Sequence, residues 1–275
     1  MVLVHGLGGA AVNWSAVGPG LAARARVVAP DLAGFGRTPL AGRTARVRAN
    51  QRLLGRFVDE LAVDPVILVG NSMGGMISLL EAADHPERVA GLVLVDPAVP
   101  RPRGVRLDPR IALRFATYAA PGLGERLLAR HRARLGPEGM VADVLQVCCA
   151  EPEQVPAELV EAMRAATRER VGFAWADTAF LQAARSMITS MVVRPRRFLA
   201  LIAAVEVPTL VIQGAADQLV PPAAIHALVR NRPEWTVHVL DGVGHVPQLE
   251  VPGHFVELVT AWLDAQTAGP DRRAG

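Results

Sequence analysis

Short, continuous runs of apolar residues alternate along most of the chain with longer segments in which apolar positions recur every three or four residues. An unbroken run of Val, Leu and Ile is typical of a parallel strand that is buried on both faces. The longer spacing is typical of a helix with one buried face. The pattern predicts an α/β protein with a mostly parallel sheet of about six strands flanked by helices, the strands lying around Val2, Val27, Val66, Leu92, Leu210 and Val237.

The regular alternation stops after the apolar run that ends at Asp96 and resumes with the run that begins at Thr209. The segment between them has helical spacing, which is clearest in 157–170 and 178–191. Pro-Gly and similar pairs punctuate it, as expected between helices. This segment therefore predicts a helical insertion into the sheet-containing part of the chain.

These patterns divide the chain into three parts. We expect an α/β core formed by residues 1–98 and 206–268, with a helical domain of residues 99–205 inserted after the strand that ends at Asp96. The small and polar residues of 269–275 are typical of a disordered tail.

A glycine-rich junction joins the apolar run 66–69 to the helical pattern that begins at Met76. Its sequence, Gly-Asn-Ser-Met-Gly-Gly at 70–75, has the Gly-x-Ser-x-Gly spacing of a nucleophile elbow, a sharp turn that strains the serine backbone. Ser72 would then lie at the N-terminal end of a helix, where developing negative charge meets oriented N–H groups. An incidental serine in a glycine-rich turn is the alternative, and the flanking strand and helix favour a nucleophile.

A serine hydroxyl needs a base to become a good nucleophile. Asp217 follows the apolar run 209–214, and His245 follows the run 236–240. Ser, Asp, His is one of the known chain orders of a catalytic triad. Because the carboxyl ends of parallel strands meet at one edge of the sheet, we expect these two residues to converge with Ser72.

A second glycine-rich loop, His5-Gly6-Leu7-Gly8-Gly9, follows the first apolar run. It lacks the Gly-x-Gly-x-x-Gly spacing of a dinucleotide site, and it matches loops whose backbone donates hydrogen bonds to an oxyanion. The expected donors are the amides of Leu7 and of Met73, the residue after the elbow serine. For His5 we favour a structural role, in which the ring braces the loop by hydrogen bonds.

Taken together, these motifs resemble the α/β-hydrolase fold, and in particular its serine hydrolases with a helical cap. The resemblance extends from the first residues to about position 250 and rests on 5–9, 30–36, 70–75, Asp217 and 244–247. It implies Ser72 as nucleophile, His245 as general base and then acid, and Asp217 as the group that orients His245. It also implies that Asp31 and Glu250 hold loops near the site.

Two other carboxylates compete with Asp217 for the role of triad acid. Asp96 lies at the end of the strand after the elbow helix, and some members of this fold take their acid from that position. Asp241 lies four residues before His245, a spacing that makes contact with the far ring nitrogen difficult. We favour Asp217 over both.

The resemblance implies a cofactor-free serine hydrolase that cleaves a carboxylic ester, or a related acyl bond, of a small to medium apolar substrate through an acyl-enzyme on Ser72. Alternatives are carbon–carbon bond hydrolysis of vinylogous diketones, whose enzymes have a similar elbow, a cofactor-free perhydrolase, and a ligand receptor with slow turnover. The serine argues against epoxide hydrolases and haloalkane dehalogenases, which carry an aspartate there. Asn71 is an expected pocket residue. Five residues of the insertion could also line an apolar pocket, although at helical spacing we favour a place in the cap core for each: Phe173, Trp175, Phe180, Met187 and Met191.

The start of the chain departs from the family pattern. Most members have two further strands before the oxyanion loop, whereas here Met1 opens directly on the strand that precedes the loop. With those first two strands missing, the strand around Val27 becomes an unprotected edge, which is a liability for pairing with another chain. Either the start codon is placed too late or a second copy covers the edge in a homodimer.

Composition agrees with a compact enzyme for a small-molecule acyl substrate. Apolar residues make up 51% of the chain, but no run approaches the roughly 18 apolar residues of a membrane span. Neither a secretory signal nor metal-ligand spacing is visible, so no metal is expected. The only cysteines, Cys148 and Cys149, are adjacent, which fits a reducing compartment and predicts a cytoplasmic protein.

All 29 basic residues are arginine, and nine of them lie in 101–134 with only two acidic residues, Asp108 and Glu125. A solvated helical face is the interpretation that we favour. An attraction for anionic substrates or for an acidic partner surface is the alternative. Nucleic acid is not expected as a partner, because no recognised binding motif accompanies the charge.

Overall fold

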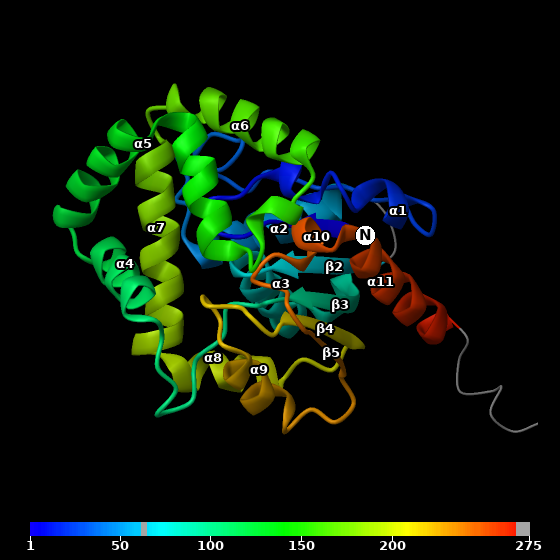
Figure 1. Ribbon diagram of the computed structural model, residues 1–275. Helices are drawn as coiled ribbons and strands as arrows, with labels where there is room; N and C mark the ends of the chain where they lie inside the picture. The colour runs from blue at the N-terminus through cyan, green and yellow to red at the C-terminus, as the bar shows by residue number, and fades with distance from the viewer. Residues whose placement is uncertain (62–64, 268–275) are drawn as a thin grey trace, which may run out of the picture.

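The structure, a computed structural model, describes residues 1–61 and 65–267 and has the expected α/β architecture (Figure 1). Within these residues one parallel sheet contains five strands, which neighbour one another in chain order. They are β1 (Val2–Val4), β2 (Val66–Asn71), β3 (Val89–Val95), β4 (Thr209–Gly214) and β5 (Thr236–Leu240). The carboxyl ends of β2, β3 and β4 are therefore adjacent, which places the segments that follow them side by side.

The sixth expected strand, around Val27, is reduced to a single bridge between Val28 and Val2. The Leu3 amide donates to the Val28 carbonyl at 2.8 Å, and the Val28 amide donates to the Met1 carbonyl at 3.0 Å. Pro30 follows two residues later and has no N–H to continue the ladder. The sequence prediction of a full strand at this edge is therefore wrong.

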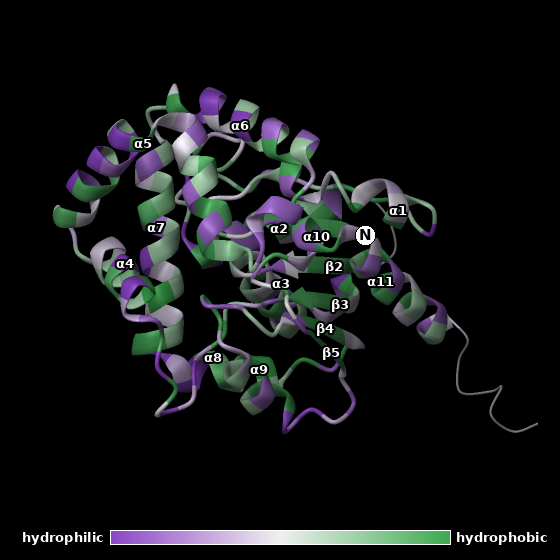
Figure 2. Cartoon of the chain, viewed as in Figure 1, coloured by the Kyte–Doolittle hydropathy of each residue, from purple (hydrophilic) through white to green (hydrophobic). Residues whose placement is uncertain are grey.

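Strands β1 to β4 are buried on both faces, which explains their apolar runs, whereas the edge strand β5 is partly exposed. Successive side chains of a strand point to opposite sides, so Leu92 and Leu94 of β3 belong to one hydrophobic cluster and Val93 and Val95 to the other. Figure 2 shows the strands in the colour of hydrophobic residues, whereas the outer helices mix both colours. The core thus lies in two layers, one on each face of the sheet.

Helices cover both faces of the sheet. One face holds α1 (Gly18–Ala22) and α11 (Pro252–Thr267), which contact each other and bury Leu21, Phe255 and Trp262. The hydrophobic cluster of the other face includes residues of α2 (Val47–Glu60), α3 (Met73–Asp84) and α9 (Pro222–Val229). Shorter helical segments are η1 (Ala11–Trp14), η2 (Pro86–Arg88) and α10 (Pro247–Glu250).

The chain between β3 and β4 is helical, as the spacing predicts. It forms α4 (Pro109–Ala119), α5 (Leu123–Cys148), η3 (Pro152–Gln154), α6 (Ala157–Val171), α7 (Ala176–Ile188), the π-helical η4 (Thr189–Val193) and α8 (Pro195–Ala203). Helix α5 contacts α4, α6 and α7. Figure 1 shows α4 to α7 gathered on one side of the sheet.

Helix α5 is kinked at Gly136, whose φ of 64° lies in the left-handed region, and Pro137 follows it. Among the described residues, no helix is both long and apolar enough to cross a membrane. The disordered tail expected at 269–275 lies outside the described residues.

Candidate active site

Ser72 occupies the sharp turn between β2 and α3. Its backbone has φ 52° and ψ −115°, a strained conformation for a residue with a β-carbon. Its amide donates to the Val95 carbonyl at 2.9 Å, which ties the turn to the neighbouring strand β3. A β-carbon at Gly74 would lie 2.0 Å from the Val4 carbonyl oxygen, and one at Gly70 would lie 2.6 Å from the Gly74 backbone. The Gly-x-Ser-x-Gly spacing is therefore a steric requirement of this turn.

The two expected oxyanion donors lie at the ends of β1 and β2. Met73 is the first residue of α3, so its amide has no acceptor within the helix. Leu7 lines the same cavity as Ser72, and its amide has no backbone acceptor among the described residues. Both amides are thus available for a negatively charged oxygen.

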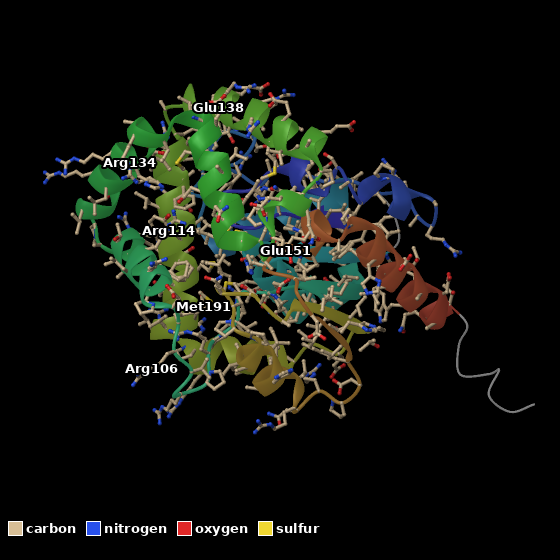
Figure 3. The ribbon with its side chains drawn as sticks, in the orientation of Figure 1. Arg106, Arg114, Arg134, Glu138, Glu151 and Met191 are labelled. Atoms are coloured by element: carbon tan, nitrogen blue, oxygen red, sulfur yellow. The ribbon has the colours of Figure 1, made fainter. Side chains whose placement is uncertain are left out.

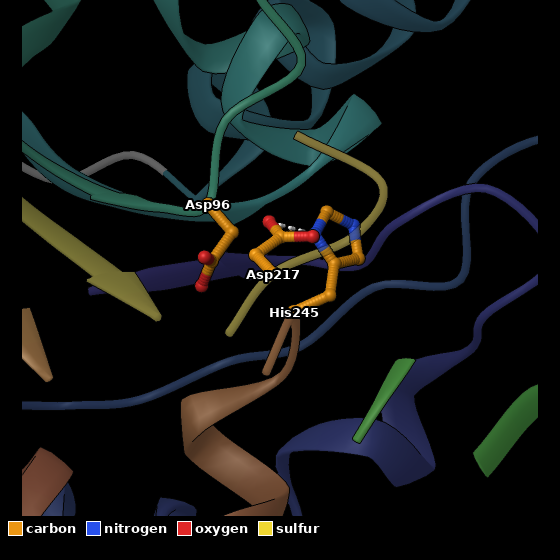
Figure 4. A group of neighbouring side chains, drawn as sticks. All are labelled: Asp96, Asp217 and His245. Atoms are coloured by element: carbon orange, nitrogen blue, oxygen red, sulfur yellow. Dashed lines mark hydrogen bonds and ion pairs between the residues drawn. The ribbon is translucent and has the colours of Figure 1, made fainter. Parts of the chain in front are cut away.

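His245 pairs with Asp217, as Figure 4 shows. Asp217 Oδ2 lies 2.7 Å from His245 Nδ1, and both side chains are buried. The other oxygen of Asp217 accepts from the amides of Leu219 at 2.7 Å and Val220 at 3.0 Å, which fixes the carboxylate. Because the carboxylate accepts at Nδ1, that nitrogen carries the proton and Nε2 is left as the basic nitrogen.

The three candidate acids have different surroundings, and Asp217 is the one that hydrogen-bonds His245. Asp241 is exposed, whereas Asp96 is fully buried at the end of β3, with φ 43°. Asp96 Oδ1 accepts from the Gly214 amide at 2.8 Å, and Oδ2 has no partner among the described residues. Burial, followed by the charge of Asp217, raises the pKa of Asp96 well above its usual range. Asp96 is thus a buried neighbour of the pair whose protonated form is favoured, and it has no hydrogen bond to His245.

Ligand atoms of Asp96, Asp217 and His245 lie within 4.8 Å of one another, a spacing that a metal site can have. However, hydrogen bonds already engage these groups. Asp217 uses both oxygens, one of them for His245 Nδ1, and Asp96 uses one for Gly214. This arrangement suits proton transfer better than metal binding.

Ser72 and His245 line the same cavity, but no hydrogen bond joins their side chains within the described residues. Catalytic hydrogen bonds of unliganded enzymes are often long and tighten only when substrate binds. The structure therefore brings the serine and the His–Asp pair to one cavity without forming the complete relay.

The loop that carries His245 is held by hydrogen bonds of Asn71, Cys148 and Glu250, and of these three the sequence predicts a loop-holding role only for Glu250. The Asn71 side-chain amide donates to the His245 carbonyl at 3.0 Å, and the His245 amide donates to the Cys148 carbonyl at 2.5 Å. Glu250 accepts from the amides of Gly244, at 3.0 Å, and Ala150, at 2.8 Å. Segment 148–150 at the end of α5 is thereby fastened to the histidine loop.

His5 and Asp31 have the loop-bracing contacts that the sequence predicts. His5 is buried, and its Nε2 accepts from the Leu32 amide at 3.1 Å while Nδ1 lies 2.8 Å from the Gly6 carbonyl. Burial lowers the pKa of His5 to about 4, so the ring is neutral. Asp31 accepts from the amides of Ala11 at 2.7 Å and Arg37 at 2.9 Å.

A cavity of about 790 Å³ lies between the sheet and the inserted helices. Four of the residues considered for the pocket line this cavity: Asn71, Phe180, Met187 and Met191. Phe173 and Trp175 do not belong to its lining. Their rings stack on each other with centroids 4.9 Å apart, because the α6–α7 turn directs them together. The prediction for these two aromatic residues is therefore corrected.

Arg170 is a cavity residue that the sequence did not single out. Its guanidinium lies 5.2 Å from the Phe35 ring centre and 5.9 Å from the Trp175 ring centre, and it donates to the carbonyls of Gly34 and Ala176. Desolvation lowers its pKa to about 10. It lines the cavity and forms no ion pair within the described part of the chain, although the charges of Asp177 and Asp31 act on it from a distance.

Comparisons with known proteins agree with this geometry. Residues 1–252 match the family model described as the alpha/beta hydrolase fold. The chain is 29% identical over 271 residues to a 2-hydroxy-6-oxo-6-phenylhexa-2,4-dienoate hydrolase of Burkholderia cepacia, covering 96% of this chain and 87% of that protein. It is 27% identical to a pimeloyl-[acyl-carrier protein] methyl ester esterase of Aeromonas hydrophila, covering 94% and 93% of the two chains.

Solved structures show the same fold. A putative lipase of Acinetobacter baumannii superposes with a TM-score of 0.75 at 24% identity, covering 98% of this chain and 84% of that chain. The haloalkane dehalogenase DbeA of Bradyrhizobium elkani superposes with a TM-score of 0.80 at 23% identity, covering 98% and 91%. At these identities the likeness concerns the fold alone.

Proposed function

Since the chain belongs to the α/β-hydrolase fold family, we propose that it is a serine hydrolase that cleaves a carboxylic ester of a small to medium apolar substrate. The observation that carries this proposal is the His245–Asp217 pair, with Nδ1 2.7 Å from Oδ2, at the cavity that Ser72 also lines. We assign residues 99–205 to a cap over the core of 1–98 and 206–268. The cavity between them is the substrate site.

The reaction has two halves. His245 Nε2 takes the proton from Ser72 Oγ as the oxygen attacks the ester carbonyl, and the amides of Leu7 and Met73 stabilise the oxyanion. His245 then gives the proton to the leaving alkoxide, which departs as the alcohol. Water, deprotonated by the same ring, attacks the acyl-enzyme, and the acid product leaves with Ser72 restored.

Three features of the site support this sequence of events. Asp217, held by two backbone amides, stabilises the imidazolium that forms on His245 in each half. Each oxyanion donor contributes about 3–4 kcal/mol, because the amides are oriented before the charge develops. The apolar residues Phe180, Met187 and Met191 suit an acyl chain.

Carbon–carbon bond hydrolysis of a vinylogous diketone is the second candidate function. The dienoate hydrolase among the relatives and a 2-hydroxymuconate semialdehyde hydrolase of Pseudomonas, 30% identical over 271 residues, support it. Arg170 also supports it, because a guanidinium that lines the cavity and has no ion-pair partner within the described residues is suited to a substrate carboxylate. The same serine and histidine would serve both reactions.

A labelling experiment tests the shared chemistry, and a substrate series separates the two candidates. A fluorophosphonate should label the wild-type protein rapidly and Ser72→Ala not at all. Turnover of p-nitrophenyl esters, with a clear optimum of acyl length, is the result expected for the esterase. Slow esterolysis together with fast loss of dienoate absorbance would instead assign carbon–carbon hydrolysis. Labelling that persists in Ser72→Ala would refute both.

Location and assembly are also proposals. Cys148 and Cys149 are free thiols, which supports a place in the reducing cytoplasm. The short pairing at Val28 leaves the sheet edge open to a second copy, and a homodimer would cover it. Sedimentation equilibrium measures the assembly, with a monomer as the result that excludes the dimer.

A further inference from the structure

Two inserted segments, 101–113 and 191–199, concentrate positive charge, and we call them the basic edge. They contain seven arginines and a single acidic residue, Asp108, so their net charge is +6. The whole chain carries +3, so all remaining residues together carry −3. The basic edge is thus one of the most positively charged parts of the protein. In Figure 3, Arg106 and Met191 mark the two segments on the same side of the molecule.

The arginines of the basic edge have no acidic partner in the described fold. Elsewhere about half of the described arginines pair with carboxylates, as Arg88 does with Asp59 and Arg185 with Glu125. Within the described residues, none of the basic-edge arginines pairs with a carboxylate side chain, and six of the seven donate no side-chain hydrogen bond: Arg103, Arg106, Arg110, Arg194, Arg196 and Arg197. Their charges are therefore available to an outside partner.

Exposed aliphatic side chains lie among these arginines. Leu113 is 69% exposed, Val192 63% and Val193 70%. Removing such apolar surface from water would stabilise a complex by about 25 cal/mol for each Å² that is buried. An occupant that matches this edge must therefore offer negative charge and an apolar interior together.

The basic edge also surrounds an opening of the active-site cavity. Arg101 and Ala112 from the first segment, and Val192 from the second, line the cavity and are exposed on the outer surface. A residue that is both exposed and part of the lining marks where the cavity opens. A partner bound at this edge would face the route that leads toward Ser72.

We propose that the basic edge docks the protein on an anionic lipid surface, with Val192 and Val193 inserted among the acyl chains. Lipid headgroups supply the negative charge, and the bilayer interior accepts the valines. Each arginine near such a surface contributes about 1 kcal/mol, equal to a roughly fivefold change in binding. An apolar acyl substrate then enters the cavity from the bilayer. That last step rests on the proposed esterase function, whereas docking does not.

Vesicle sedimentation with the Ser72→Ala protein measures docking without turnover. Vesicles of phosphatidylcholine with about one third phosphatidylglycerol should bind the protein at about 0.1 M salt, and pure phosphatidylcholine should not. Raising the salt to about 0.5 M should release most of the protein, because surface charges are screened. Equal binding to both vesicle types, or to neither, would overturn the proposal. Neither result would bear on esterolysis, which is assayed separately with Ser72 intact.

A pair of charge reversals locates the contact. Arg196→Glu with Arg197→Glu should weaken binding to anionic vesicles by at least about 30-fold, since two cationic contacts are lost. Arg52→Glu with Arg56→Glu makes the same change in net charge on exposed positions of α2 and should leave binding within about threefold. Equal weakening by both pairs would show that only net charge matters and would refute a defined edge.

The valines separate a lipid surface from an acidic protein. Val192→Ser with Val193→Ser should weaken vesicle binding at least about tenfold, since two buried aliphatic side chains are lost. The melting temperature should change little, because both positions are exposed. A different outcome would overturn the lipid proposal. If the protein binds no vesicles, and if polyglutamate retains the wild type and the double valine variant equally, the edge is assigned to an acidic polypeptide.

Discussion

Replacing Asp96 with asparagine tests how the buried carboxyl beside the catalytic pair is held. Asp96 is fully buried, and its pKa is raised first by burial and then by the charge of Asp217. The folded protein therefore keeps a proton on Asp96 that the unfolded chain has lost above about pH 4. Asparagine retains an oxygen that can accept from the Gly214 amide and carries no ionisable group. The variant thus removes the titration and little else.

The sign of the effect follows from proton linkage. Because the folded state binds more protons than the unfolded state, the free energy of unfolding of the wild type falls as pH rises. The slope contributed by Asp96 is about 1.4 kcal/mol per pH unit between the unfolded-state and folded-state pKa values, and it vanishes beyond them. The free energy of unfolding of Asp96→Asn, relative to that of the wild type, should therefore rise with pH at this slope. The pH at which the difference stops rising gives the folded-state pKa of Asp96.

Urea unfolding at intervals of half a pH unit from pH 4 upward measures the difference between the two proteins. Asp241→Asn is the matched control, because Asp241 is exposed and its replacement should give a nearly constant difference. A difference that stays constant for Asp96→Asn, or that falls as pH rises, would mean that Asp96 is ionised in the folded protein. The account of a neutral neighbour beside Asp217 would then be refuted.

Three further predictions follow from single contacts. Gly74→Ala should lower the melting temperature by more than about 5 °C and slow fluorophosphonate labelling, because the added methyl lies 2.0 Å from the Val4 carbonyl oxygen; unchanged melting would contradict the elbow geometry. As pH falls from 7 to 4, the free energy of unfolding of His5→Gln should rise by about 3 kcal/mol relative to that of the wild type in urea unfolding, because the wild type must protonate a buried ring whose pKa is lowered to about 4. A difference that does not change with pH would refute this. Arg170→Met should raise KM at least about tenfold for a carboxylate-bearing substrate and leave that for a neutral ester within about twofold, and equal effects on both would exclude a carboxylate contact.

Features encoded by neighbouring residues were predictable from the sequence. The buried strands follow from apolar runs, because such runs suit a sheet that is covered on both faces. The turn at Ser72 follows from glycines at fixed offsets, because local backbone sterics require them. The sequence also predicts that Ser72, Asp217 and His245 lie near one another, since parallel strands bring their carboxyl ends to one edge of the sheet. The helical character of the insertion follows from its apolar spacing.

Only the tertiary structure decided the remaining features. It paired His245 with Asp217 and buried Asp96 beside them with a raised pKa, an arrangement that depends on burial and on groups far apart in the chain. It turned Phe173 and Trp175 away from the cavity and reduced the edge strand at Val28 to one bridge. Apolar spacing says which side chains are buried but not against what, because the partners of a buried group are set by how distant elements pack.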